Sequence, residues 1–112
     1  MKKDWKLRSA WELFREFHNK KKDEDGFYTR KELFQYLKDN GVDLNSHSNT
    51  TIDHYRNMSQ VSGFLSRSIP GVYYVKYKIP EQWTSKRLRS FYDRVSDNIE
   101  QDYQEIKEAN NL

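Results

Sequence analysis

The chain has no cysteine, and only two prolines and four glycines occur in its 112 residues. The lack of cysteine excludes disulfide bonds, thiolate metal sites and cysteine nucleophiles. No apolar run approaches the roughly 20 residues of a membrane-spanning helix. No apolar stretch follows the basic start MKKDWKLRSAW, as a secretory signal would require. We therefore expect a soluble, intracellular, cytoplasmic protein that uses no membrane.

Aromatic and charged residues are what the sequence has in abundance. Three Trp, eight Tyr and six Phe can bury more area per residue than aliphatic side chains, and a disordered chain would have few of them. Charged residues make up 33% of the chain. At this length there is room for one core, so we expect one small domain with a heavily charged surface.

The charges are segregated along the chain. Residues 46–94 contain eight Lys or Arg against three Asp or Glu, whereas residues 95–112 contain one against five. A basic middle followed by an acidic tail suggests a polyanionic partner. Ordinary solvated charge is the alternative interpretation.

The first predicted helix covers residues 6–21. Its apolar side chains recur at intervals of three and four residues, which indicates an amphipathic helix, and His18 borders this stripe. A second helix, about 29–40, should begin at a capping box formed by Thr29 and Glu32 and should end at Gly41. The apolar stripe of the first helix consists of Leu7, Ala10, Trp11, Phe14 and Phe17.

The stretch KKDEDGFYTRKEL (residues 21–33) has two incompatible interpretations. With Gly26 at position six of a calcium loop, Asp23, Asp25, Thr29 and Glu32 fall on ligand positions. Position one is then a lysine, however, which removes a carboxylate and repels the ion, and no second loop follows. In the other interpretation Gly26 forms a turn, residues 27–28 form a short strand, and the capping box begins the second helix. We favour the strand and cap, and expect no bound metal.

A third helix, about 50–62, should be capped by Asn49 or Thr50 and end at Gly63. Its expected inward stripe is Ile52, Tyr55, Met58 and Val61. After it, the sequence FLSRSIPGVYYVKYKIP is rich in β-branched and aromatic residues around Pro70-Gly71, which predicts a β-hairpin.

One long helix is expected from Trp83 or Thr84 to about Glu108. Its apolar residues form a nearly heptad seam. Two alternatives stay open: its first half packs against the first helix, or its seam pairs with a second copy in a homodimer. The seam residues are Leu88, Tyr92, Val95, Ile99, Tyr103 and Ile106.

The order of these elements over residues 7–80 resembles the winged helix-turn-helix family. TRKELFQYLKDNG is similar to the second helix of that family, and TTIDHYRNMSQVSGFLSRSIPGVYYV to its recognition helix and wing. The resemblance implies an α+β, mainly α fold: a winged helix (three-helix bundle with a β-hairpin wing) in residues 1–80, and a long C-terminal helix in residues 81–112. It also implies a transcriptional regulator that binds double-stranded DNA and is associated with the nucleoid.

The third helix would lie in the major groove, where Asn pairs with adenine and Thr contacts the thymine methyl group. The loop at 42–49 is longer than the family's simplest turn, and Arg56 is the helix's one Lys or Arg. The expected base-facing residues are Thr50, Thr51, His54 and Asn57. The expected phosphate-binding residues are Arg56, Gln60, Arg67, Ser68, Lys76, Lys78, Lys86 and Arg87.

Catalytic signatures are missing. His18, His47 and His54 lack metal-ligand spacing, and the glycines are scattered at turns rather than gathered in a phosphate loop. We expect no enzyme and no cofactor. A winged helix that docks on another protein of the polymerase or replication machinery, without contacting DNA, remains the alternative function because fold does not determine function.

Overall fold

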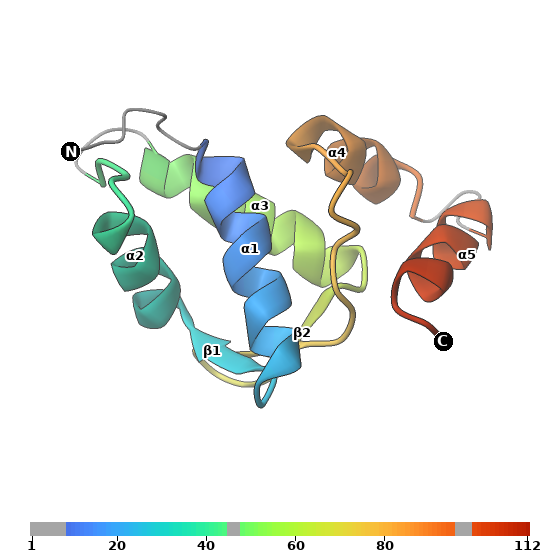
Figure 1. Cartoon of the computed structure of the whole chain (residues 1–112), viewed down its shortest axis with the longest axis horizontal. Coiled ribbons are helices and arrows are strands. Elements are labelled where there is room, and N and C mark those ends of the chain that lie inside the picture. Colours follow the sequence, from blue (N-terminus) through green and yellow to red (C-terminus); the bar gives the residue numbers. More distant parts are fainter. Residues whose placement is uncertain (1–8, 45–47, 96–99) are drawn as a thin grey trace.

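The structure is a computed structural model that describes residues 9–44, 48–95 and 100–112. The chain is α+β and mainly helical, as expected. Figure 1 shows α1 crossing α3 at the centre, with α2 on one side and α4 and α5 on the other. The elements are α1 (Ala10–Asp23), β1 (Phe27–Thr29), α2 (Arg30–Asp39), α3 (Ser48–Val61), β2 (Leu65–Ile69), β3 (Val72–Val75), α4 (Ser85–Asp93) and α5 (Glu100–Ala109).

The three strands form an antiparallel sheet in the order β1-β3-β2. The predicted hairpin is confirmed: β2 and β3 are joined at Pro70-Gly71, and Gly71 has a φ of +81°. Proline followed by a residue of positive φ is the type II turn arrangement. One face of the sheet is buried against the helices through Tyr28, Leu65, Tyr73 and Val75.

Helix α1 begins later than expected. Ser9 and Glu12 form a capping box at its start, and Leu7 lies outside the described residues. His18 is not a boundary residue, because its side chain is fully buried and its Nε2 lies 2.8 Å from the carbonyl oxygen of Tyr77. The buried side chains of α1 are Trp11, Leu13, Phe14, Phe17 and His18.

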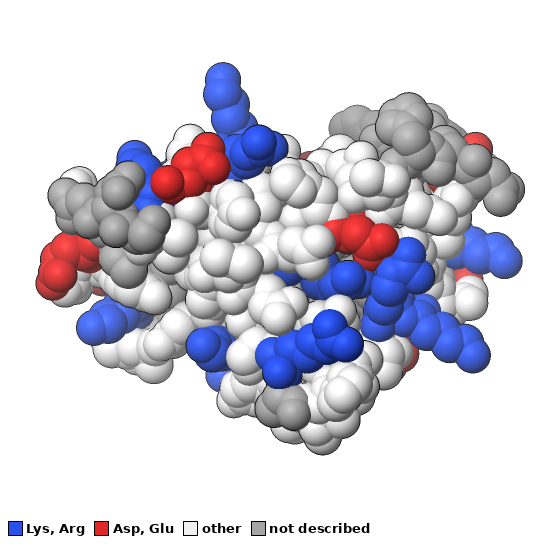
Figure 2. Space-filling model, turned by 180° about the vertical axis from the view of Figure 1, so that it is seen from behind, with Lys and Arg blue, Asp and Glu red and all other residues white. Residues whose placement is uncertain are grey.

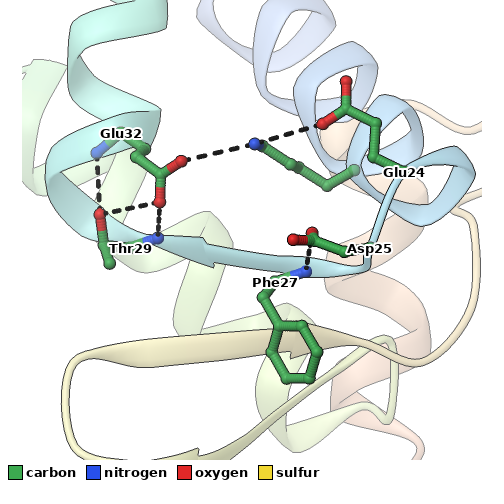
Figure 3. A network of polar contacts seen from close by, with 6 residues as sticks. Glu24, Asp25, Phe27, Thr29 and Glu32 are labelled. Atoms are coloured by element: carbon green, nitrogen blue, oxygen red, sulfur yellow. Dashed lines mark hydrogen bonds and ion pairs between the residues drawn. The ribbon is translucent and has the colours of Figure 1, made fainter.

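The strand-and-cap interpretation of residues 21–33 is confirmed (Figure 3). Thr29 Oγ1 accepts a hydrogen bond from the Glu32 amide, and Glu32 Oε1 accepts one from the Thr29 amide. Asp25 accepts a hydrogen bond from the amide of Phe27. Lys21 Nζ lies 3.4 Å from a carboxylate oxygen of both Glu24 and Glu32. These carboxylates are therefore engaged by backbone amides and a lysine.

Helix α3 starts at Ser48, so neither Asn49 nor Thr50 is its N-cap. Ile52 and Met58 are buried as expected, but the prediction for Val61 is wrong, since this side chain is 58% exposed. Val61 follows Ile52 by nine residues, and at about 100° per residue this places it half a turn from the buried face. Arg56, Ser59 and Ser62 are buried on α3 and its C-terminal turn.

The second strand of the hairpin was expected to run to Ile79, but β3 ends at Val75, so neither Lys76 nor Lys78 lies on a strand. Side-chain amides bind the backbone beyond it instead. Asn19 donates to the carbonyl and accepts from the amide of Ile79 (both 2.8 Å). Asn110 does the same for Lys78, at 3.0 and 2.7 Å. The backbone of Lys78 and Ile79 is therefore bound by α1 through Asn19 and by the residue that follows α5, Asn110.

The single long C-terminal helix is not observed. Helix α4 ends at Asp93, and the amides of Arg94 and Val95 bond to carbonyls three residues back, in a tight last turn. The seam residues Leu88 and Ile106 are buried in the chain's own core. Helix α4 packs against α3, and Trp83 just before it accepts a hydrogen bond from Trp11 of α1. No described helix is long and apolar enough to span a membrane.

Candidate nucleic-acid interface

The outward face of α3 carries the residues that the sequence predicted to face bases. Thr50, His54 and Asn57 are exposed and follow one another at spacings of four and three residues. Val61 continues the same line, four residues further on. Thr51 is half-buried and lies off this line. We call Thr50, His54, Asn57 and Val61 the α3 stripe, and none of the four side chains is a Lys, Arg, Asp or Glu.

An ion-pair cluster borders the stripe on the side of α2. Arg30 Nε and Nη2 donate to the two carboxylate oxygens of Asp53 at 2.9 and 3.0 Å. Arg56 Nη1 donates to Asp53 Oδ1 at 2.9 Å. The hydrogen bonds from Arg30 lower the pKa of Asp53 and in turn raise the pKa of Arg30. The Arg30 side chain nevertheless remains 50% exposed.

The hairpin joins this cluster through an aromatic ring. The guanidinium carbon of Arg56 lies 4.8 Å from the centre of the Tyr73 ring, and that of Arg67 lies 5.9 Å from it. Arg67, on β2, is exposed. The exposed arginine of the hairpin is therefore held near the buried arginine of α3. The side chain of Ser68 lies outside the described residues.

Helix α4 borders the stripe on its other side. Arg89 Nη1 lies 3.0 Å from Nε2 of His54, and Arg89 Nε lies 3.9 Å from Asp93 Oδ2. Because a guanidinium is always a donor, this nitrogen of His54 accepts, and its proton is on Nδ1 in the neutral ring. Arg89 is 57% exposed at its side chain. Lys86, on the same helix, is also exposed.

Three of the residues expected to bind phosphate are engaged by carboxylates of the chain itself. Arg56 is only 8% exposed and is paired with Asp53, so its expected place on the outer face is wrong. Lys78 Nζ lies 2.7 Å from Asp23. Arg87 is bound by two carboxylates of α5; burial works against its charge, yet these hydrogen bonds raise its pKa. Gln60 is half-buried at the flank of the stripe.

Arg67, Lys76 and Lys86 remain exposed, and within the described ranges no carboxylate lies in ion-pair contact with them. The structure adds Arg30 and Arg89, which the sequence analysis missed. Arg30 contacts Asp53, which is 23 residues away in the sequence, and Arg89 contacts His54, which is 35 residues away. No local sequence pattern predicts such distant pairs. Figure 2 views the side on which α3 lies and shows Lys and Arg side chains gathered over part of this face beside an acidic spot.

Searches against known protein families, characterised proteins and solved structures found no match. The candidate site is a stripe without charged side chains, bordered by exposed cations on α2, the hairpin and α4. Among the described residues, no group of His, Asp and Glu is arranged to hold a metal ion.

Proposed function

We propose that this chain is a winged helix that binds duplex DNA, with α3 in the major groove and the β2–β3 hairpin as the wing. The observation that carries the proposal is the placement of exposed cations on both sides of the α3 stripe. Arg30 and Arg67 lie on one side and Arg89 on the other. The major groove of a duplex has the complementary pattern: its base edges are uncharged, and the two strands that border it carry negatively charged phosphates.

The contacts divide by chemistry. Thr50, His54 and Asn57 are the residues assigned to base edges, because hydroxyl, imidazole and amide groups match the donors and acceptors of the major groove. Arg30, Arg67, Arg89, Lys76 and Lys86 are assigned to phosphate, where contacts set register and salt dependence without selecting sequence. Arg56, Lys78 and Arg87 take a structural role, because their charges are matched within the chain and their side chains are less exposed than those of Arg30 and Arg89.

The test is the retention of mixed-sequence genomic duplex by the full chain, measured by mobility shift at about 50 and 200 mM salt. We expect binding that weakens steeply with salt. Arg67→Glu and Lys76→Glu should each weaken it, with folding checked by circular dichroism. Lys107→Glu, on α5, is the matched control: it is also an exposed cation but lies outside the interface, and it should leave retention nearly unchanged. Absence of retention at the lower salt concentration would overturn the proposal.

One observation favours the alternative, a winged helix that docks on another protein. The predicted recognition helix carries a single arginine, and that arginine is buried and ion-paired. If the folded chain retains no duplex at low salt, this alternative becomes the better proposal. The same charge-reversal variants then serve to test a protein partner.

A further inference from the structure

The α3 stripe ends in an apolar side chain that the protein core does not use. Val61 is 58% exposed, on the same line as Thr50, His54 and Asn57. Single exposed apolar residues are common, so exposure alone carries no function. What sets Val61 apart is that it continues a helix face whose other members are polar and which exposed arginines border on two sides.

The geometry points to Val61 as a specificity residue that contacts the 5-methyl group of a pyrimidine in the major groove. This inference rests on the proposed DNA binding and names the feature that the site would select. In the major groove the methyl group of thymine is the apolar feature of the base edges, and it is recognised by apolar contact rather than by hydrogen bonds. A branched aliphatic side chain suits that contact, whereas it offers nothing to a phosphate or to a polar base edge.

The dimensions of the stripe fit several base pairs. Thr50 and Val61 are eleven residues apart, which corresponds to about 16 Å along a helix at 1.5 Å per residue. At 3.4 Å per base pair this is about five base pairs. Asn57, one turn before Val61, has an amide that suits adenine, so adenine and thymine would be selected by neighbouring residues of one face. The preferred ligand is then an A·T-containing duplex.

Thymine and 5-methylcytosine both carry this methyl group. Two pairs of DNA copolymers, each pair differing only in the methyl group, show which of the two bases is preferred. The probes are alternating poly(dA-dT) and poly(dA-dU), which differ only in the methyl group, and alternating poly(dG-dC) with and without cytosine methylation. Burying one methyl group corresponds to about a fourfold change in affinity. We expect the full chain to bind poly(dA-dT) at least about fourfold more tightly than poly(dA-dU), and to bind both G·C copolymers more weakly than poly(dA-dT).

Val61→Ser isolates the contact, because it removes both methyl groups of the side chain and leaves only a hydroxyl. It should lower the ratio of affinities for poly(dA-dT) and poly(dA-dU) by a factor of about four. Ile69→Ser is the matched control, since Ile69 is a similarly exposed aliphatic residue (56%) on the hairpin rather than on α3. It should leave the ratio unchanged even where it alters overall affinity.

Failure of this inference is distinguishable from failure of the proposed function. Equal binding of the thymine and uracil copolymers overturns the methyl contact while DNA binding stands. An unchanged ratio in Val61→Ser overturns the assignment to Val61. A preference for methylated over unmethylated poly(dG-dC) that exceeds the thymine preference overturns the choice of thymine. No retention of any duplex overturns both proposals together.

Discussion

Arg30 of α2 and Asp53 of α3 form a bidentate ion pair. Nε and Nη2 of the arginine lie 2.9 and 3.0 Å from the two carboxylate oxygens. Asp53 also binds Arg56, which is nearly buried. One carboxylate thus holds a structural arginine inside the domain and an exposed arginine at its surface. It also places a negative charge beside the proposed DNA interface.

Asp53→Asn should therefore act in opposite directions on stability and on DNA binding. We expect a loss of about 2 kcal/mol in the free energy of unfolding, because the buried guanidinium of Arg56 loses its counter-charge. DNA affinity at low salt should rise, because a charge that repels phosphate is removed. Urea unfolding and mobility shift measure the two effects. Arg30→Gln is the control: breaking the exposed arm of the pair should cost less than about 1 kcal/mol and should weaken DNA binding.

The buried carboxylate of α5 offers a second test. Asp102 is 5% exposed and accepts hydrogen bonds from Arg87 and Arg94 of the α4 region. Asp102→Asn should lower the free energy of unfolding by about 2 kcal/mol, since the partly buried Arg87 and the more exposed Arg94 lose their shared, buried counter-charge. Glu105 also binds Arg87 but its side chain is 47% exposed, so Glu105→Gln should cost less than about 1 kcal/mol. Equal costs for the two variants would show that the burial of Asp102 has no energetic weight.

His18 predicts how stability depends on pH. Burial lowers its pKa from 6.5 to about 4, against the effect of its bond to Tyr77, which raises it. The unfolded chain therefore binds a proton at His18 more readily than the folded chain. The stability contributed by the neutral ring is complete above pH 6.5 and falls by about 3 kcal/mol as the pH drops to 4.

His18→Gln separates this effect from the carboxylates that also titrate in acid. A glutamine amide can still donate to the carbonyl oxygen of Tyr77 but does not titrate. Chemical unfolding at pH 7, 6, 5 and 4 should show a smaller loss of stability in the variant than in the parent chain. Parallel pH profiles would contradict the burial of a neutral imidazole.

Two glycines with similar backbone conformations should respond differently to substitution. Gly26 and Gly71 have φ values of +84° and +81°. A Cβ on Gly26 would lie 3.1 Å from Tyr74 Cε1, whereas one on Gly71 would meet nothing within 4 Å. Gly71→Ala should cost about 1 kcal/mol for the left-handed conformation alone. Gly26→Ala should cost more, by about 1 kcal/mol, because the Tyr74 ring has to move. Thermal unfolding of both variants measures the difference.

Signals confined to a few consecutive residues were predicted well from the sequence. The capping box of Thr29 and Glu32 and the Pro70-Gly71 turn depend on groups three or fewer residues apart, and both are present. The exposed positions Thr50, His54 and Asn57 followed from helical periodicity alone. These features are decided by local backbone geometry, which a short window of sequence contains.

What could not be predicted depends on partners far away in the chain. Arg56 was expected at the surface, since nothing near it in sequence reveals that the Tyr73 ring lies beside its guanidinium. The seam from Leu88 to Ile106 fits one helix or two equally well, because apolar spacing does not show where a chain bends. Arg89 was overlooked because its neighbour His54 is 35 residues away.

The two asparagines that bind Lys78 and Ile79 have a consequence for how this molecule behaves among its own copies. A segment next to a sheet whose backbone amides and carbonyls are unpaired can bind a strand of another molecule. Such pairing is the first step toward aggregation. Here all four polar backbone groups of the two residues are already taken by Asn19 and Asn110. Each carboxamide forms the two hydrogen bonds that a neighbouring strand would otherwise make with that residue. A strand of another molecule therefore has no unpaired backbone group to bind at Lys78 and Ile79.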